Sequence, residues 1–176
     1  MVTKQRLWRW AGLLGLVSGG LLALGGVGVL GNLGFAGSAF ALAHLLLTLV
    51  IIGMYGPQVE QTGWLGLAGF AMMLLGNVLF FSDQVSDLGD AAPFPPSSIL
   101  TAGVLLFAIA NTQAGVLPPW AGWLMFLGLG LNLLGGAVQW PEAINSVAAP
   151  ILNALGVAWF GLALWTLPPE PDFTDI

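Results

Sequence analysis

The segment WAGLLGLVSGGLLALGGVGVL (residues 10–30) is uncharged along its whole length. The three basic residues of the chain, Lys4, Arg6 and Arg9, stand directly before it. A membrane-spanning helix needs about 20 consecutive apolar residues, and a charged side chain at the bilayer centre costs about 2.5–3.5 kcal/mol or more. The segment therefore predicts a transmembrane helix, and its basic flank predicts an N-terminus in the cytoplasm.

Charge and apolar sequence are separated in the same way along the rest of the chain. Only 6% of the residues are charged and the mean hydropathy is +0.93, whereas a soluble domain has about 25% charged residues. The sequence predicts an all-α membrane protein with a single transmembrane domain over residues 1–176. Six transmembrane helices are expected, at residues 10–30, 33–54, 63–81, 98–111, 119–138 and 147–167.

The expected orientation follows from this number of spans. An even number returns the C-terminus to the side of the N-terminus, so both termini are predicted to be cytoplasmic. The connections at 55–62 and 112–118 then face the cytoplasm, and those at 82–97 and 139–146 face outward. Most tryptophans fall near the cytoplasmic ends of the expected helices, where amphipathic rings settle at a membrane interface.

Two apolar segments indicate an internal repeat. GWLGLAGFAMMLLGNVLF (residues 63–80) aligned with GWLMFLGLGLNLLGGAVQ (residues 122–139) shares the opening Gly-Trp-Leu and further Gly and Leu positions. Such a repeat predicts three tandem helical hairpins with the same orientation in the membrane. The hairpins would form a pseudo-threefold arrangement or a simple up-down bundle. Closely spaced small residues such as Gly15 and Gly19 predict helices that approach one another closely.

The charge pattern argues against an enzyme and against a nucleic-acid partner. Intramembrane hydrolysis needs paired carboxylates, a nucleophile with a base, or a metal site, and the chain has one histidine and no cysteine. A net charge of −5 disfavours binding to phosphate backbones. The expected partners are the lipid bilayer and other membrane-protein subunits. All acidic residues lie in expected connections or the tail: Glu60, Asp83, Asp87, Asp90, Glu142, Glu170, Asp172 and Asp175.

His44 is the only ionisable side chain within an expected span. It could hydrogen-bond to an Asn or Ser of a neighbouring helix, or line a polar cavity for a substrate or proton. It could also be the single axial ligand of a haem or chlorophyll-type pigment, because one neutral imidazole is enough for a pentacoordinate metal. No other cofactor and no other metal ligand are expected.

Three asparagines form a second group of candidates: Asn77, Asn132 and Asn153. Each is expected in the outer half of its helix, where an amide must find a partner. They could form hydrogen bonds between helices, or line a shallow cavity that opens to the outer surface beneath the loop with Asp83, Asp87 and Asp90. Trp159, the one tryptophan expected near mid-span, is a further candidate for contact with a ligand.

Two stretches resemble a pattern found in small, uncharacterised multi-span bacterial membrane proteins. They are AHLLLTLVIIGMYGPQVEQTGWLGLAGFAMMLLGNVLF (residues 43–80) and AGVLPPWAGWLMFLGLGL (residues 114–131). The resemblance implies a location in the bacterial inner membrane, and it assigns no catalytic residues.

Exclusion of charge and abundance of small and aromatic residues favour a non-catalytic bundle. We expect either an accessory subunit of a larger membrane complex or a binder of an apolar ligand such as a lipid, a quinone or a pigment. The alternative is a channel or facilitator for a small neutral solute, with His44 and the asparagines lining the path.

Overall fold

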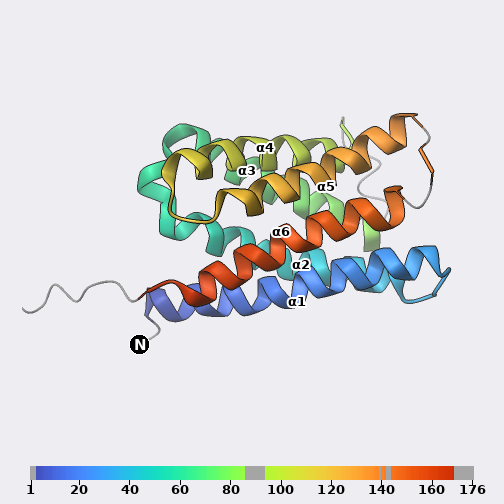
Figure 1. The fold of residues 1–176 in the computed structure, drawn as a ribbon, viewed down its shortest axis with the longest axis horizontal. Helices are drawn as coiled ribbons and strands as arrows, with labels where there is room; N and C mark the ends of the chain where they lie inside the picture. The colour runs from blue at the N-terminus through green and yellow to red at the C-terminus, as the bar shows by residue number, and fades with distance from the viewer. Residues whose placement is uncertain (1–2, 86–93, 139, 142–143, 169–176) are drawn as a thin grey trace, which may run out of the picture.

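A computed structural model describes residues 3–85, 94–138, 140–141 and 144–168, which contain helices and no strand (Figure 1). The prediction of an all-α protein is confirmed. A short 3-10 turn, η1 (Gly56–Gln58), precedes the third helix, and a π-helical turn, η3 (Ile144–Ala148), leads into the last. The α-helices are α1 (Lys4–Leu30), α2 (Ala36–Tyr55), α3 (Val59–Val85), α4 (Pro96–Ala114), α5 (Pro119–Val138) and α6 (Ala149–Thr166).

The helices run up and down and form a closed ring. Each helix packs against its neighbours in sequence, and α1 also packs along α6 (Figure 1). The α1–α6 and α3–α4 pairs make the most extensive contacts. Helix α1 belongs to the first expected hairpin and α6 to the last. Because these two helices pack together extensively, the hairpins are not separate packing units. The structure is therefore an up-down bundle, and the internal repeat with its pseudo-threefold symmetry stays a prediction.

Four helical segments of the described chain are long and apolar enough to cross a membrane: Lys4–Leu30, Ala36–Asp83, Pro96–Ala114 and Ile144–Thr166. The second of these contains α2, η1 and most of α3 in one helical path. Helix α5 is also apolar, but its described apolar part, Pro119–Gly135, is shorter. The fold is consistent with a membrane protein, and the crossing by all six helices stays a prediction.

The structure corrects two of the expected boundaries. Residues 55–62, expected as a loop, are helical, and the chain bends instead at Gly63 (φ 54°, ψ −150°). A positive φ with this ψ is a backbone conformation that glycine adopts far more readily than other residues, which is why the break falls there. Helix α4 is longer than the expected 98–111, because it starts at Pro96 and ends against Gly115, whose φ of 66° forms a left-handed C-cap.

Glycines allow α1 and α6 to touch through their backbones. A Cβ atom added at Gly12 would lie 2.6 Å from the carbonyl oxygen of Gly161, and one at Gly15 would lie 2.8 Å from the Cα of Gly161. At Gly19 an added Cβ would lie 2.7 Å from the carbonyl oxygen of Ala154. The predicted close approach at Gly15 and Gly19 is confirmed, and it is typical of helix packing in membranes, where small residues replace hydrophobic attraction.

The interior of the ring is filled with apolar side chains toward the end where α1 begins. Phe107 and Phe160 meet edge to face with ring centroids 6.1 Å apart, and both are buried. Leu47, Met54 and Leu164 are fully buried in the same cluster. We refer to this end as the N-terminal end, and the packed cluster closes the ring there.

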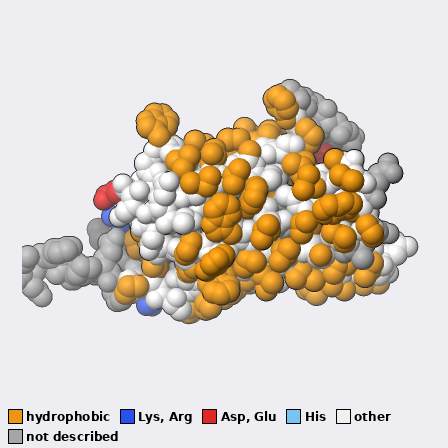
Figure 2. Space-filling model, turned by 45° about the horizontal axis from the view of Figure 1, so that its top comes forward, with side chains coloured by type: hydrophobic (Ala, Val, Ile, Leu, Met, Phe, Trp, Pro, Cys, Tyr) orange, Lys and Arg blue, Asp and Glu red, His pale blue; other side chains and the backbone are white. Residues whose placement is uncertain are grey.

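The surface is apolar over its length. Figure 2 shows one face on which hydrophobic side chains cover the middle, while the few visible charges lie toward the ends. Trp64 and Trp120 are 83% and 71% exposed at the N-terminal end, as is typical of tryptophans at a membrane interface. So much exposed apolar surface is rare on a soluble monomer and is consistent with contact with lipid.

Substitution of Gly161 tests the closure of the ring. Gly161→Ala places a methyl group 2.6 Å from the carbonyl oxygen of Gly12, and we expect it to destabilise the protein by about 1–3 kcal/mol. Gly20→Ala is the matched control, because no atom lies within 4 Å of the added Cβ. Alanine there should leave stability unchanged or raise it by about 0.5–1 kcal/mol. Thermal unfolding in one detergent measures both. Equal melting temperatures would contradict the backbone contact between α1 and α6.

Candidate functional site

A cavity of about 400 Å³ lies inside the ring at the end opposite the N-terminal end. All six α-helices and η3 contribute to its lining. The contributing helix residues come from the C-terminal halves of α1 and α3, from the middle of α5 onward, and from the N-terminal halves of α2, α4 and α6. The cavity is therefore the unfilled end of the bundle interior, and it continues the axis of the packed core.

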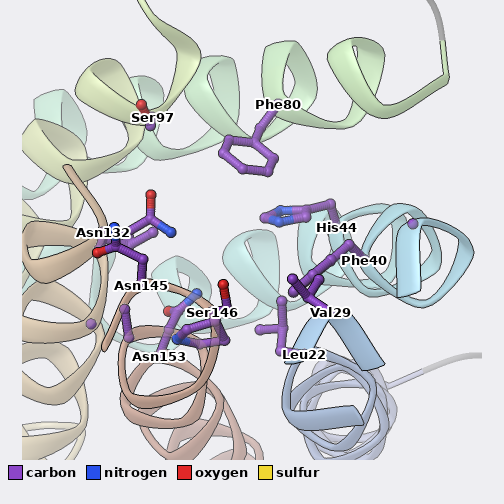
Figure 3. A pocket seen from close by; sticks show the side chains of 15 residues that line it. Leu22, Val29, Phe40, His44, Phe80, Ser97, Asn132, Asn145, Ser146 and Asn153 are labelled. Atoms are coloured by element: carbon purple, nitrogen blue, oxygen red, sulfur yellow. The ribbon is translucent and has the colours of Figure 1, made fainter. Parts of the chain in front are cut away.

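The two sides of the cavity differ in chemistry. Figure 3 shows His44 with Phe80 and Phe40 on one side, and Leu22 and Val29 near them. The amide and hydroxyl side chains gather across the cavity from this wall (Figure 3). They are Asn132, Asn145, Ser146 and Asn153. The site thus combines an aromatic and aliphatic wall, interrupted by one imidazole, with a wall of neutral polar groups.

Asn77 on α3 fixes the position of His44 through hydrogen bonds. The Nδ1 atom of His44 lies 2.8 Å from Oδ1 of Asn77. The Nδ2 atom of Asn77 donates to the backbone oxygen of His44 at 2.8 Å and to Oγ1 of Thr48 at 2.9 Å. Asn77 is fully buried and His44 is 3% exposed. The expected hydrogen bond between His44 and an asparagine of a neighbouring helix is confirmed, and it links α2 to α3.

Phe80 fixes the plane of the imidazole. It follows Asn77 by nearly one turn on α3, and its ring centroid lies 4.5 Å from that of His44, with an angle of 31° between the planes. Both rings line the cavity. With Asn77 at one ring nitrogen and Phe80 over one face, His44 has a single defined orientation, which a binding group requires.

The π-helical turn η3 brings two further polar side chains to the cavity. Asn145 and Ser146 both lie in it and both line the cavity. A π-helical turn is uncommon and often occurs at functional sites. Gly135 makes room for this turn, because an added Cβ atom would collide with the Asn145 amide. Gly26 allows α1 to approach it, since its Cβ would lie 2.8 Å from the carbonyl oxygen of Ser146.

Two amide oxygens of the polar wall have no partner in the described part of the chain. They are Oδ1 of Asn145 and Oδ1 of Asn153. Asn153 is 5% exposed, so its amide is largely removed from solvent while it borders the cavity. An unpaired amide oxygen in a low-dielectric interior costs about 1–3 kcal/mol. Both oxygens are closed to solvent, so they would meet a donor in the cavity only if their side chains turned.

The candidates named from the sequence are only partly brought together. His44, Asn132 and Asn153 line the cavity, and Asn77 is hydrogen-bonded to His44. Trp159 does not line it: its side chain is 49% exposed, because it lies on the side of α6 that faces away from the buried residues. Asp87 and Asp90, expected above the cavity, lie outside the described residues.

Sequence reasoning missed Ser97, Asn145 and Ser146. All three fall in the segments 82–97 and 139–146 that we expected to be loops, whereas Ser97 is in the first turn of α4 and the other two form η3. The short polar run Ile-Asn-Ser directly before an apolar helix was the available signal.

The described lining offers no multidentate metal site. No group of three or more His, Asp or Glu side chains that could hold a metal ion occurs among the described residues, and His44 is the only titratable side chain in the part of the lining that the structure describes. Ligation of a single pigment metal by His44 stays a prediction.

Comparison with known proteins adds no assignment. No family model matches the chain, and no curated protein and no solved structure is significantly similar to it. The function must therefore be argued from the site.

The hydrogen bonds around His44 can be tested by a double-mutant cycle. Asn77→Leu leaves the buried Nδ1 of His44 unpaired, and we expect a loss of about 1–3 kcal/mol. His44→Leu alone should cost a similar amount, because it leaves the Asn77 amide oxygen without its donor. The double variant should be less destabilised than the sum of both, since no unpaired group remains. Thermal unfolding in detergent checks this, and strictly additive losses would show that the two side chains do not interact.

Proposed function

We propose that this chain is a membrane-embedded binding protein that holds one small, largely apolar molecule in the cavity. The observation that carries the proposal is a cavity of about 400 Å³ inside the ring, lined by all six helices. Cavities for small ligands typically measure about 300–1,000 Å³ and combine apolar walls with a few placed polar groups. The apolar wall with His44 and the facing amides have this composition.

The closed core supports binding rather than passage. A channel needs a continuous polar path, and here Phe107, Phe160 and Met125 are buried at 0–1% exposure in the cluster that fills the ring. A molecule that enters the cavity end meets this cluster. We therefore rank the facilitator for a small neutral solute below a binding role.

A non-catalytic role agrees with the chemistry of the lining. General acid–base catalysis needs titratable groups near the reacting atoms, and His44 is the single such group among the described residues that line the cavity. An accessory subunit could use the same cavity to hold a lipid, a quinone or a pigment for a larger complex.

The proposed location is the bacterial inner membrane, with both termini in the cytoplasm. The basic residues Lys4, Arg6 and Arg9 and the exposed Trp10 and Trp165 mark the N-terminal end, which supports this orientation. The cavity end then faces outward, so that its ligand enters from the outer leaflet or from the space beyond it.

The experiment compares two glycine-to-phenylalanine variants. Gly37 lines the cavity and no atom lies within 4 Å of its added Cβ, so Gly37→Phe should fill the cavity without a clash. Gly130→Phe on α5 has the same open surroundings but does not line the cavity. Native mass spectrometry of protein extracted in mild detergent should detect a bound small molecule in the wild type and in Gly130→Phe. The Gly37→Phe variant should lose it.

Two results would count against the proposal. If the wild type carries no small molecule and binds none on exposure to a total lipid extract, the cavity is not a binding site. If proteoliposomes release glycerol and Gly37→Phe stops this flux, the facilitator is the better account.

A further inference from the structure

We infer that the ligand carries an uncharged hydroxyl head, an alcohol or a phenol such as the head of a quinol, and that its O–H donates to Nε2 of His44. The inference rests on the proposed binding function and specifies the chemical class of the ligand. It is carried by the hydrogen bonds that surround His44 and by the absence of charged side chains from the described residues of the cavity lining.

The first step is the orientation of the Asn77 amide. The backbone oxygen of His44 can only accept a hydrogen bond, and it lies 2.8 Å from Nδ2 of Asn77. The amide nitrogen must therefore face this carbonyl. The amide oxygen, an acceptor, is left to face Nδ1 of His44 at 2.8 Å. The carbonyl thus dictates which end of the amide meets the imidazole.

The second step is the tautomer of His44. Because Oδ1 of Asn77 only accepts, Nδ1 of His44 must carry the proton. In the uncharged ring the proton is then absent from Nε2, which becomes an acceptor. No partner for Nε2 occurs among the described residues, and His44 borders the cavity. Nε2 of His44 can therefore accept a hydrogen bond from a molecule that enters the cavity.

The third step is the charge of the ligand. Among the described residues that line the cavity there is no Lys, Arg, Asp or Glu. Among these described residues a carboxylate or phosphate head would find no cation to offset its desolvation, and an ammonium head would find no anion. The cavity therefore favours a neutral group, and a hydroxyl is the common neutral donor that a lone imidazole acceptor binds.

The fourth step is the rest of the ligand. Phe80, whose ring is tilted against that of His44, and Phe40 with Leu22 provide apolar contacts beside the hydroxyl position (Figure 3). The amides of Asn132 and Asn153 lie across the cavity and can pair with a second polar group of the same molecule. A compact ring or chain with a hydroxyl at one edge matches this arrangement.

The test uses para-tert-butylphenol and para-tert-butylanisole, which differ by the replacement of O–H with O–CH₃. Because the chain has one histidine, protein labelled with nitrogen-15 histidine gives imidazole signals from His44 alone. We expect the free protein to show a protonated Nδ1 and an unprotonated Nε2. The phenol should move the Nε2 signal upfield as the nitrogen accepts a hydrogen bond. The anisole, added at equal mole fraction in the micelle, should not.

Variants separate the hydrogen bond from general apolar binding. The His44→Leu/Asn77→Leu protein keeps an apolar pair at both positions, and we expect it to lose the phenol's advantage of about three- to tenfold in affinity over the anisole. Leu155→Ala is the control, because Leu155 is 52% exposed on α6 and outside the lining. It should bind both probes as the wild type does.

The outcomes distinguish this inference from the proposed function. Equal shifts with both probes, or a proton on Nε2 in the free protein, would overturn the hydroxyl assignment while binding in the cavity stands. If neither probe is excluded by Gly37→Phe, the binding is outside the cavity, and the proposed function fails with it.

Discussion

The backbone contact between α1 and α6 closes the ring, and the cavity depends on it. Gly12, Gly15 and Gly161 let the first and last helices meet at distances that no Cβ atom would allow. This contact brings Leu22 and Val29 of α1 to the same cavity as Asn153 of α6. Without it the ring would open on one side, and the cavity would be a groove that faces lipid. Helix packing through small residues is therefore a condition for the site as well as for the fold.

Side-chain size then decides which end of the interior is filled. At the N-terminal end the ring contains Phe107, Phe160 and several Leu and Met side chains. At the other end the residues that line the cavity include Gly37 and Ala149, whose small size leaves space. The space is not apolar throughout, because η3 turns Asn145 toward it. The same ring of helices therefore provides a packed support at one end and a cavity with defined polar groups at the other.

The sequence was sufficient for the class of fold and for part of the site. Charge exclusion and apolar length predict the helices because hydrocarbon penalises charge strongly, and His44 was prominent for the same reason. The bend at Gly63 and the helical state of residues 55–62 were not predicted, because a Gly-Pro-Gln turn between helices is compatible with either a loop or a corner. Asn145 was missed because its position depends on a π-helical turn, for which local sequence gives little signal. Trp159 was misplaced as a candidate because depth along a helix does not determine which face a side chain occupies.

His44 illustrates why a structural and a functional role need not compete. Its Nδ1 and its backbone oxygen both bond to Asn77, so one amide satisfies the polar groups of a helix that would otherwise be costly in a low-dielectric interior. That same amide fixes the tautomer and leaves Nε2 at the cavity. The interaction that stabilises α2 against α3 therefore also determines what the imidazole offers to a ligand. A membrane bundle with so few polar groups can combine both roles in one residue, because each ring nitrogen of histidine serves a different partner.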